Sequence, residues 1–498
     1  MPLRLYDTLH SQLKPLEPGP DGAIRLYVCG PTVYDHPHIG HMRACIIYDL
    51  LVRHLRQQGF RVRYVRNITD VDDKILRRAA ERGETPEAIA ERYTASYREA
   101  AERLFCVPPD LEPKVTEHMD EIRALVARLI AGGFAYVSQG DVYFSVQAFP
   151  DYGKLSHRKL ADLEAGASGR VADEETQRKR HPSDFALWKA AKPDEPSWPS
   201  EWGPGRPGWH IECSAMCMKH LGTTFELHGG GLDLIFPHHE NEIAQSQAAT
   251  GQPLARLWVH NGFVELNKEK MSKSTGNFFT ARECFRFVEP EALRYFVMTT
   301  HYRAPLNLEW VQDASGQVSG FPQVEESERR VEYLYATRLR LEGVPAERLD
   351  LADAEVDPEL AELPARLAAV LDDDLNLPAA LSVLAEFLKR VNDAVDVASR
   401  KRGKLAAAQR EAMRAGFAHF GRVLGLGLDD AAAFSERVRA RRLRTLGLEQ
   451  ASIERKIADR IAARQARDFQ GADAIRDELL ALGVELMDGP SGTTWRLR

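Results

Sequence analysis

Two histidines flank a glycine in His38-Ile39-Gly40-His41, where a strand-like run gives way to a helical pattern. The start of a helix offers free backbone N–H groups and partial positive charge, which together attract anions. Two imidazoles one turn apart add hydrogen-bond donors, and Gly40 lets a flat ring or a phosphate approach the backbone. The segment could therefore hold a nucleoside triphosphate and stabilise charge that develops at its α-phosphate.

A cationic stretch, Lys270-Met271-Ser272-Lys273-Ser274, follows more than 200 residues later. A flexible loop carrying Lys270 and Lys273 could close over a pyrophosphate held at the helix start, supplying charge mainly in the transition state. The plain alternative is an exposed turn rich in lysine and serine. The pairing with the histidine segment favours the phosphate role.

Possible metal ligands form a third group. His238 and Glu242 are four residues apart and would share one helical face. Two thiolates, an imidazole and a carboxylate suit tetrahedral zinc, and a buried inert cysteine is the usual alternative. The candidates are Cys29, Cys213, His238 and Glu242, with Cys217, His239 and His228 as rivals.

The elements that must position these residues begin with a βαβ unit. The run from Ile24 to Cys29 is strand-like, Met42 to Leu55 has helical periodicity, and Val62 to Arg66 is strand-like again. Strand, helix and strand in this order predict a parallel nucleotide-binding sheet of the α/β class.

Further elements follow the same pattern. We expect a helix over 116–131, a strand from Phe225 to His228 that ends in a glycine loop, a helix from Pro237 to Ala248, and sheet from Leu257 to Leu266. The proline-rich, charged stretch between Gly140 and Pro207 indicates a subdomain inserted into the catalytic domain. After about Gly320 the composition is almost wholly helical.

This organisation predicts a Rossmann-type catalytic domain split by an insertion and followed by a helical bundle. The expected units are 1–115 and 208–319 for the two catalytic halves, 116–207 for the insertion, 320–432 for the bundle, and 433–498 for a small C-terminal domain.

Composition excludes several classes of protein. At 498 residues with 44% hydrophobic and 28% charged side chains, the chain is neither a single module nor disordered. No apolar run approaches a membrane span, and the N-terminus lacks the apolar core of a signal peptide, so we expect a cytoplasmic protein with no membrane partner. Six cysteines are too few for a disulfide framework.

Positive charge is concentrated near the C-terminus of a chain whose overall net charge is −7. Residues 436–467 hold ten basic and four acidic side chains, a net charge of +6, as a surface for a phosphate backbone would need. The alternative, and the better interpretation of this stretch alone, is a solvated helix face opposite a buried stripe of Ile453, Ile457 and Ile461.

Taken together, these motifs resemble the bacterial cysteinyl-tRNA synthetases, a family of class I aminoacyl-tRNA synthetases, nearly end to end. The resemblance rests on the segments 27–41, 67–74, 184–189, 208–214, 236–242 and 270–277. It is looser over 324–357 and 403–437.

The resemblance implies an enzyme that activates L-cysteine with ATP and Mg²⁺ to cysteinyl-adenylate, then transfers the cysteinyl group to the terminal adenosine of cysteine tRNA. It places the catalytic residues at His38, His41, Lys270 and Lys273, and one zinc ion per chain on Cys29, Cys213, His238 and Glu242. A zinc ion that binds the substrate thiolate would favour sulfur over the hydroxyl of serine. Thr32 and Trp209 would contact cysteine, and Gly40, Gly230, Asp233 and Lys273 would contact ATP.

The C-terminal residues resemble the anticodon-binding tail of the family, which implies that 433–498 contacts tRNA. Asp473 and Asp488 could accept hydrogen bonds from base edges, and Phe469 and Trp495 could stack on bases. The family often has tryptophan where this chain has Phe469. The resemblance also implies a monomer. Two rivals are a cysteine ligase of mycothiol biosynthesis, which lacks such a tail, and a non-catalytic tRNA-binding paralogue.

Overall fold

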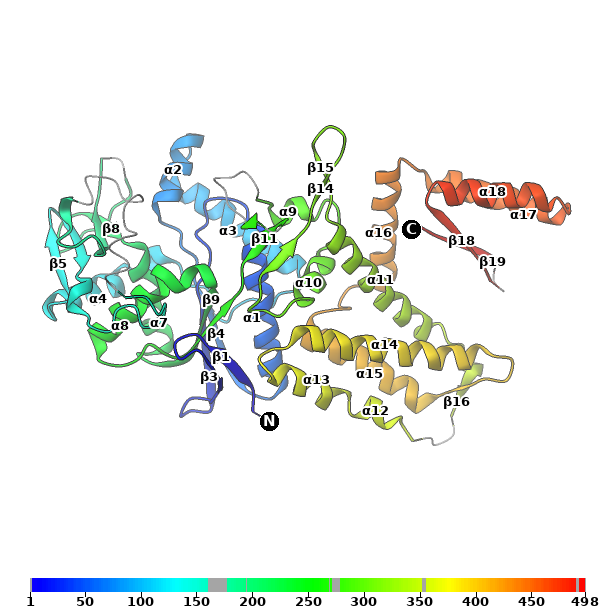
Figure 1. The fold of residues 1–498 in the computed structure, drawn as a ribbon, viewed down its shortest axis with the longest axis horizontal. Helices are drawn as coiled ribbons and strands as arrows, with labels where there is room; N and C mark the ends of the chain where they lie inside the picture. The colour runs from blue at the N-terminus through cyan, green and yellow to red at the C-terminus, as the bar shows by residue number, and fades with distance from the viewer. Residues whose placement is uncertain are drawn as a thin grey trace.

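A parallel sheet of four strands lies at the centre of the catalytic part, in the order β10-β9-β3-β4 (Figure 1). The computed structural model describes residues 2–159, 177–193, 195–267, 269–270, 278–351, 355–489 and 492–497. The strands are β3 (Ala23–Val28), β4 (Arg61–Arg66), β9 (Phe225–Gly231) and β10 (Ala255–Asn261). The connection from β3 to β4 runs through helix α1 (Ile39–Gln57), which confirms the predicted βαβ unit and the α/β class.

The sheet is buried because its strands carry apolar side chains on both faces. Ile24, Leu26 and Val28 of β3 lie on one face and are each at most 3% exposed, and Tyr27 on the opposite face is 0% exposed. This nearly continuous apolar run is typical of parallel strands covered on both faces. Helix α1 packs its apolar residues, among them Ile46 and Leu50, into the same core.

The three glycines at the end of β9 extend the strand instead of forming the expected loop. Gly229, Gly230 and Gly231 pair in parallel register with Val259, His260 and Asn261 of β10. A Cβ atom on Gly229 would lie 2.3 Å from the ring of Tyr48, and one on Gly230 would lie 2.7 Å from the ring of His239. Glycine is needed at these positions because neighbouring side chains approach the backbone closely. From the sequence alone, the three glycines are interpreted as a turn signal.

An antiparallel sheet interrupts the parallel one, as the expected insertion requires. Helix α4 (Met119–Ala131) precedes it, and helix α7 (Trp209–Leu221) returns the chain to the parallel sheet. Its strands, in order, are β5 (Ala135–Ser138), β6 (Asp141–Phe144), β7 (Phe185–Ala190) and β8 (Gly205–Pro207).

Two expected helices begin later than predicted. The helix expected over 116–131 starts at Met119, after a separate 3₁₀ turn at Val115–Glu117. The helix expected from Pro237 starts at Glu240 as α8 (Glu240–Thr250), because Ile235–His239 winds as a wider π turn. That turn places His238 and His239 beside the sheet, where both are buried.

From α10 to α16 the chain is mainly helical and lies to one side of the sheet (Figure 1). Its helices are α10 (Pro290–Met298), α11 (Pro322–Glu342), α12 (Pro358–Ala361), α13 (Leu363–Asp372), α14 (Leu377–Ser399), α15 (Ala407–Leu424) and α16 (Ala431–Leu446). The boundary expected at 432/433 falls inside α16. Arg441 and Arg442 of α16 donate hydrogen bonds to Glu328 of α11, so α16 is tied to the helices that precede it.

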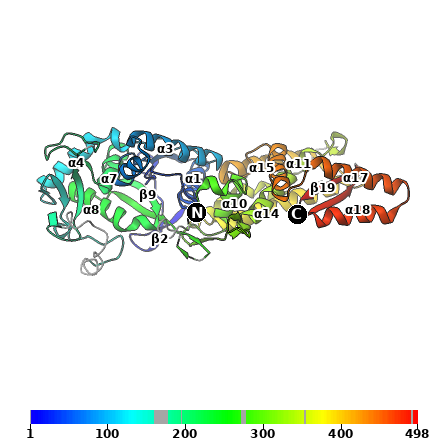
Figure 2. The ribbon, with the colours of Figure 1, turned by 90° about the horizontal axis from the view of Figure 1, so that it is seen from above.

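The C-terminal unit projects from one end of the elongated molecule (Figure 2). It contains α17 (Gln450–Gln465), α18 (Phe469–Ala481) and the antiparallel pair β18 (Val484–Gly489) and β19 (Gly492–Leu497). Its small core buries Ile453 and Ile457, whereas Ile461 is 39% exposed and falls outside the expected stripe. No helix in the described ranges is long and apolar enough to cross a membrane.

Candidate active site and metal centre

A cavity of about 330 Å³ opens at the carboxyl ends of β3 and β9. The chain leaves β3 toward β4 on one side of the sheet and later adds β9 on the other, so this is the switch point where ligands bind in open α/β sheets. Seven predicted site residues line it: Cys29, Thr32, His38, Gly40, His41, Trp209 and Asp233.

His38 and His41 form the start of α1 itself. His38 is the N-cap, and its Nδ1 accepts from the backbone N–H of His41 at 3.3 Å. The Nδ1 of His41 accepts in return from the backbone N–H of His38, also at 3.3 Å. The two rings stack with their centroids 3.6 Å apart. The helix start could be located from the sequence but this reciprocal cap could not, because histidine is not among the common N-cap residues.

The two ends of the lysine segment lie near the same helix start. Lys270 ends the short strand β12 (Glu269–Lys270), which pairs with β11 (Val264–Leu266). After the segment, Thr280 pairs with His38, and the N–H of Ile39 donates to the carbonyl of Phe279 at 3.1 Å. Lys273 lies outside the described residues.

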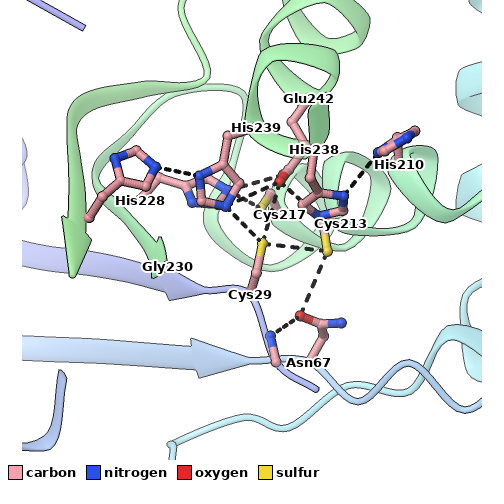
Figure 3. A network of polar contacts seen from close by, with 12 residues as sticks. Cys29, Asn67, His210, Cys213, Cys217, His228, Gly230, His238, His239 and Glu242 are labelled. Atoms are coloured by element: carbon pink, nitrogen blue, oxygen red, sulfur yellow. Dashed lines mark hydrogen bonds and ion pairs between the residues drawn. The ribbon is translucent and has the colours of Figure 1, made fainter. Parts of the chain in front are cut away.

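All four expected metal ligands converge beside the cavity (Figure 3). The Sγ atoms of Cys29 and Cys213 are 3.7 Å apart, and Cys29 Sγ is 3.4 Å from Glu242 Oε1. His238 Nε2 is 3.2 Å from the same carboxylate oxygen. Cys29 directly follows β3 and lines the cavity. Cys213 comes from α7, His238 from the π turn before α8, and Glu242 from the first turn of α8.

A second set of residues could also hold a metal ion. It shares Cys29 and Glu242 with the first set but uses His228 and His239. His228 Nε2 is 3.0 Å from Glu242 Oε2, and His239 Nε2 is 3.3 Å from Cys29 Sγ. Cys217, the remaining rival, belongs to neither set among the described residues and has its Sγ 3.9 Å from His228 Nε2.

Neighbouring side chains fix the orientation of the candidate ligands. His238 Nδ1 lies 3.0 Å from His210 Nδ1, so its Nε2 faces Glu242. Burial lowers the pKa of His238 to about 3, which keeps the imidazole neutral, as metal ligation requires. Asn67 Oδ1 accepts from the N–H of Gly30 at 2.9 Å and lies 3.7 Å from Cys213 Sγ.

Trp209 and Lys74 form one wall of the cavity. The Trp209 ring stacks on the imidazole of His238, with centroids 4.4 Å apart. The Lys74 ammonium lies over the rings of Tyr34 and Trp209, at 5.5 and 5.9 Å from their centroids. Lys74 was not among the predicted site residues, although its segment carries part of the family resemblance. Its position after the second strand of the βαβ unit is the signal that it lines the cavity.

Gly230 lies deeper than expected. Its carbonyl accepts from the hydroxyl of Tyr48 at 2.9 Å inside β9, while the next residue, Gly231, lines the cavity.

The expected tRNA contacts lie in the C-terminal unit, and they differ in how accessible they are. Phe469, at the start of α18, is 61% exposed, and Asp473 is on the same helix. Asp488 instead accepts from Arg460 at 2.9 and 2.8 Å, and these hydrogen bonds hold its pKa well below the usual range. Trp495 carries the guanidinium of Arg439 over its ring at 5.2 Å.

Much of the positive charge of residues 436–467 is balanced by acidic side chains. The pairs include Arg437 with Glu289, Arg442 with Glu332, Lys456 with Glu478, and Arg464 with Asp488. The stretch therefore offers a smaller cationic surface than its sequence suggested.

Comparison with known proteins agrees with this architecture. The model of the family described as tRNA synthetases class I (C) catalytic domain matches residues 15–314, and the DALR domain model matches residues 366–429. A protein of Anaeromyxobacter dehalogenans named cysteine–tRNA ligase is 50% identical over 512 aligned positions, covering 100% of both chains. One of Geobacter sulfurreducens with the same name is 47% identical, again covering 100% of both.

Similarity of fold extends further. The structure of methionyl-tRNA synthetase from Mycobacterium tuberculosis in complex with methionyl-adenylate superposes with a TM-score of 0.57 at 16% identity, covering 86% of this chain and 95% of that one. The chain is 50% and 47% identical to the two relatives over the full length of both chains, and it matches the catalytic-domain model. It therefore belongs to the cysteine–tRNA ligase family of class I aminoacyl-tRNA synthetases.

Proposed function

We propose that this cysteine–tRNA ligase selects L-cysteine through a zinc ion held by Cys29, Cys213, His238 and Glu242. The observation that carries the proposal is that these four side chains converge beside the cavity, which Cys29 lines together with the start of α1. A thiol-recognition site and an anion-binding helix start therefore face the same space. That is the arrangement needed to join a cysteine to a nucleotide.

The donor set fits zinc. Two sulfur atoms bound at about 2.3 Å to one tetrahedral zinc lie about 3.8 Å apart. The measured separation of Cys29 Sγ and Cys213 Sγ is 3.7 Å. Between the two possible sets, this one has both thiols, and soft sulfur ligands favour zinc over the hard cations. When bound, zinc would act as a Lewis acid that prefers the substrate thiolate to a hydroxyl.

The protein's own residues would orient the reactants. Trp209 covers the cysteine side of the cavity, and Thr32 lies where it can contact the bound amino acid. The ATP would enter with Mg²⁺ and lie along Gly40, Gly231 and Asp233, with its α-phosphate at the start of α1. Gly230 would contribute through the backbone behind this surface.

The first chemical step is adenylate formation. A carboxylate oxygen of cysteine attacks the α-phosphorus, the bond from that phosphorus to the bridging oxygen breaks, and pyrophosphate leaves with the electron pair. His38 and His41 would donate hydrogen bonds to the charge that develops on the α-phosphate, and Lys270 and Lys273 would neutralise the leaving pyrophosphate. The 3′-terminal adenosine of cysteine tRNA then attacks the cysteinyl carbonyl, and AMP leaves.

For the C-terminal unit, we assign tRNA contacts to Phe469, Asp473 and Trp495. The exposure of Phe469 supports a stacking role. Asp488 stabilises the unit mainly through its ion pair with Arg460. It would have to break that ion pair to accept a hydrogen bond from a base. The expectation of a monomer stays a prediction.

Two assays on the same preparation test the proposed function. Cysteine-dependent ATP–pyrophosphate exchange reports adenylate formation, and charging of cysteine tRNA reports transfer. We expect both activities. Exchange without charging would instead indicate a ligase for a small amine, as in mycothiol biosynthesis, and tRNA binding without either activity would indicate a non-catalytic paralogue.

A further inference from the structure

A second cavity, of about 250 Å³, lies just outside the catalytic one. It is bounded by α3 (Pro86–Arg103), by α9 (Ala281–Cys284) and by the two residues that directly precede His38. We call it the arginine pocket, after the residues that give it its character: His36, Arg92, Ser96, Arg103, Arg282 and Phe285.

The arginine pocket contains positive charge that the protein does not balance. Within the described residues, Arg282 makes no ion pair or hydrogen bond, and Arg103 contacts only the Phe285 ring, at 4.6 Å from its centroid. Arg92 is engaged by Glu84 in an ion pair. The one carboxylate that lines the pocket, Glu99, has no ion-pair partner in the described ranges either. Two exposed guanidiniums therefore share the pocket with a single opposing charge.

The pocket and the catalytic cavity are joined by one short segment. The carbonyl of Pro37 accepts from the N–H of Ala281 at 2.9 Å, and His38 pairs with Thr280. A hydrogen bond of 2.7 Å between His36 Nδ1 and Ser96 Oγ orients the imidazole of His36. A chain that enters the catalytic cavity from this side must pass the pocket within a few residues of the helix start.

The position on the fold favours a long anionic partner over a small one. In Figure 1, α3, α9 and the hairpin of β14 (Val311–Gln312) and β15 (Val318–Gly320) follow one another along the upper side of the molecule, toward α16 and the C-terminal unit. The carboxyl ends of the parallel strands open on this side. A tRNA that reaches from the C-terminal unit to the catalytic cavity would lie along it, and guanidinium groups match phosphate oxygens in pairs.

We propose that the arginine pocket binds a backbone phosphate of the tRNA close to the end that enters the catalytic cavity. This rests on the proposed function, because it takes tRNA as the substrate. Arg103 and Arg282 supply the two guanidiniums. The negative charge of Glu99 weakens the attraction of the pocket for phosphate. This lower affinity suits a substrate that must leave after each turnover.

Three substitutions and a matched control test the proposal. Arg103→Ala and Arg282→Ala should each raise the Kd for cysteine tRNA about 5-fold and reduce the slope of log Kd against log salt by about 1, the effect of losing one phosphate contact. Glu99→Gln should lower the Kd. Arg256→Ala should change nothing, since Arg256 is an exposed arginine at the opposite end of the sheet, at the start of β10, that also makes no ion pair among the described residues.

The measurements are direct tRNA binding by filter retention at several salt concentrations, and cysteine-dependent ATP–pyrophosphate exchange without tRNA. The proposal predicts altered tRNA binding with unchanged exchange. It is overturned if the Arg103 and Arg282 variants bind tRNA as the wild type does, or if exchange falls in parallel with binding. A wild-type protein that binds tRNA but does not charge it would contradict the proposed function alone, since the binding comparison still tests the pocket.

Discussion

Replacing Cys213 with serine is expected to lower cysteine-dependent ATP–pyrophosphate exchange by roughly 100-fold, because loss of even an outer-shell partner of a metal ligand costs about 10- to 100-fold. It should also remove most of the preference for cysteine over serine. A hydroxyl is a poor replacement for a thiolate ligand, and a pocket that relies on size alone separates these two substrates weakly. The measurement is the ratio of exchange rates with cysteine and with serine, together with the zinc content.

Cys217 provides the matched control for this variant. It lies on the same helix, one turn after Cys213, and both side chains are buried. Cys217→Ser makes the same chemical change outside the proposed zinc ligands, so the exchange rate should stay within about 3-fold of wild type. Any effect of the substitution should appear as a lower free energy of unfolding. A Cys213→Ser protein that retains its zinc and its discrimination, or a Cys217→Ser protein that loses both, would contradict the ligand assignment.

The second large effect is expected at His38, where two roles can be separated. Both His38→Asn and His38→Ala remove the imidazole, and each should slow pyrophosphate exchange by roughly 100-fold or more, the usual effect of losing one donor to developing charge. Asparagine is a good N-cap and alanine is not, so only His38→Ala should lower the free energy of unfolding, by about 1 kcal/mol. Exchange kinetics and denaturant titration measure the two effects.

A different pattern would change the interpretation of the reciprocal cap between His38 and His41. If His38→Asn exchanged pyrophosphate at the wild-type rate, His38 would serve only to start α1. If both variants lost equal stability, the cap would be carried by contacts other than the bond from the His41 N–H to His38 Nδ1.

The βαβ unit and the helix start at His38 could be predicted from sequence because they depend on local patterns. A mostly apolar run sets β3, the β-branched and aromatic residues Val62, Tyr64 and Val65 set β4, and 3.6-residue periodicity sets α1. The same local logic was wrong at Gly229 to Gly231. The need for glycine arises at Gly229 from Tyr48, which is distant in the chain, and at Gly230 from His239, and both rings approach the strand only in the fold.

Long-range pairing also explains what the sequence could not decide. The sequence left the charge of residues 436–467 open between a solvated helix face, which it favoured, and a surface for nucleic acid. In the fold its partners include Glu328 and Glu332 of α11, more than 100 residues earlier. In the metal centre, the spacing of Cys213 and Cys217 on α7 gave no preference between them. The fold separates them along one face of α7. Cys213, one turn nearer the start of the helix, lies beside Cys29 and Asn67, whereas Cys217 lies beside His228.

The most direct test of the proposed zinc-dependent selection of cysteine is to remove the metal and restore it. The enzyme is stripped with a chelator, assayed for cysteine-dependent ATP–pyrophosphate exchange, and then titrated with zinc while metal content is measured. The proposal predicts that exchange is lost on stripping and returns in proportion to bound zinc, reaching its full value at about one ion per chain. Full exchange by metal-free protein, with cysteine still preferred over serine, would contradict it.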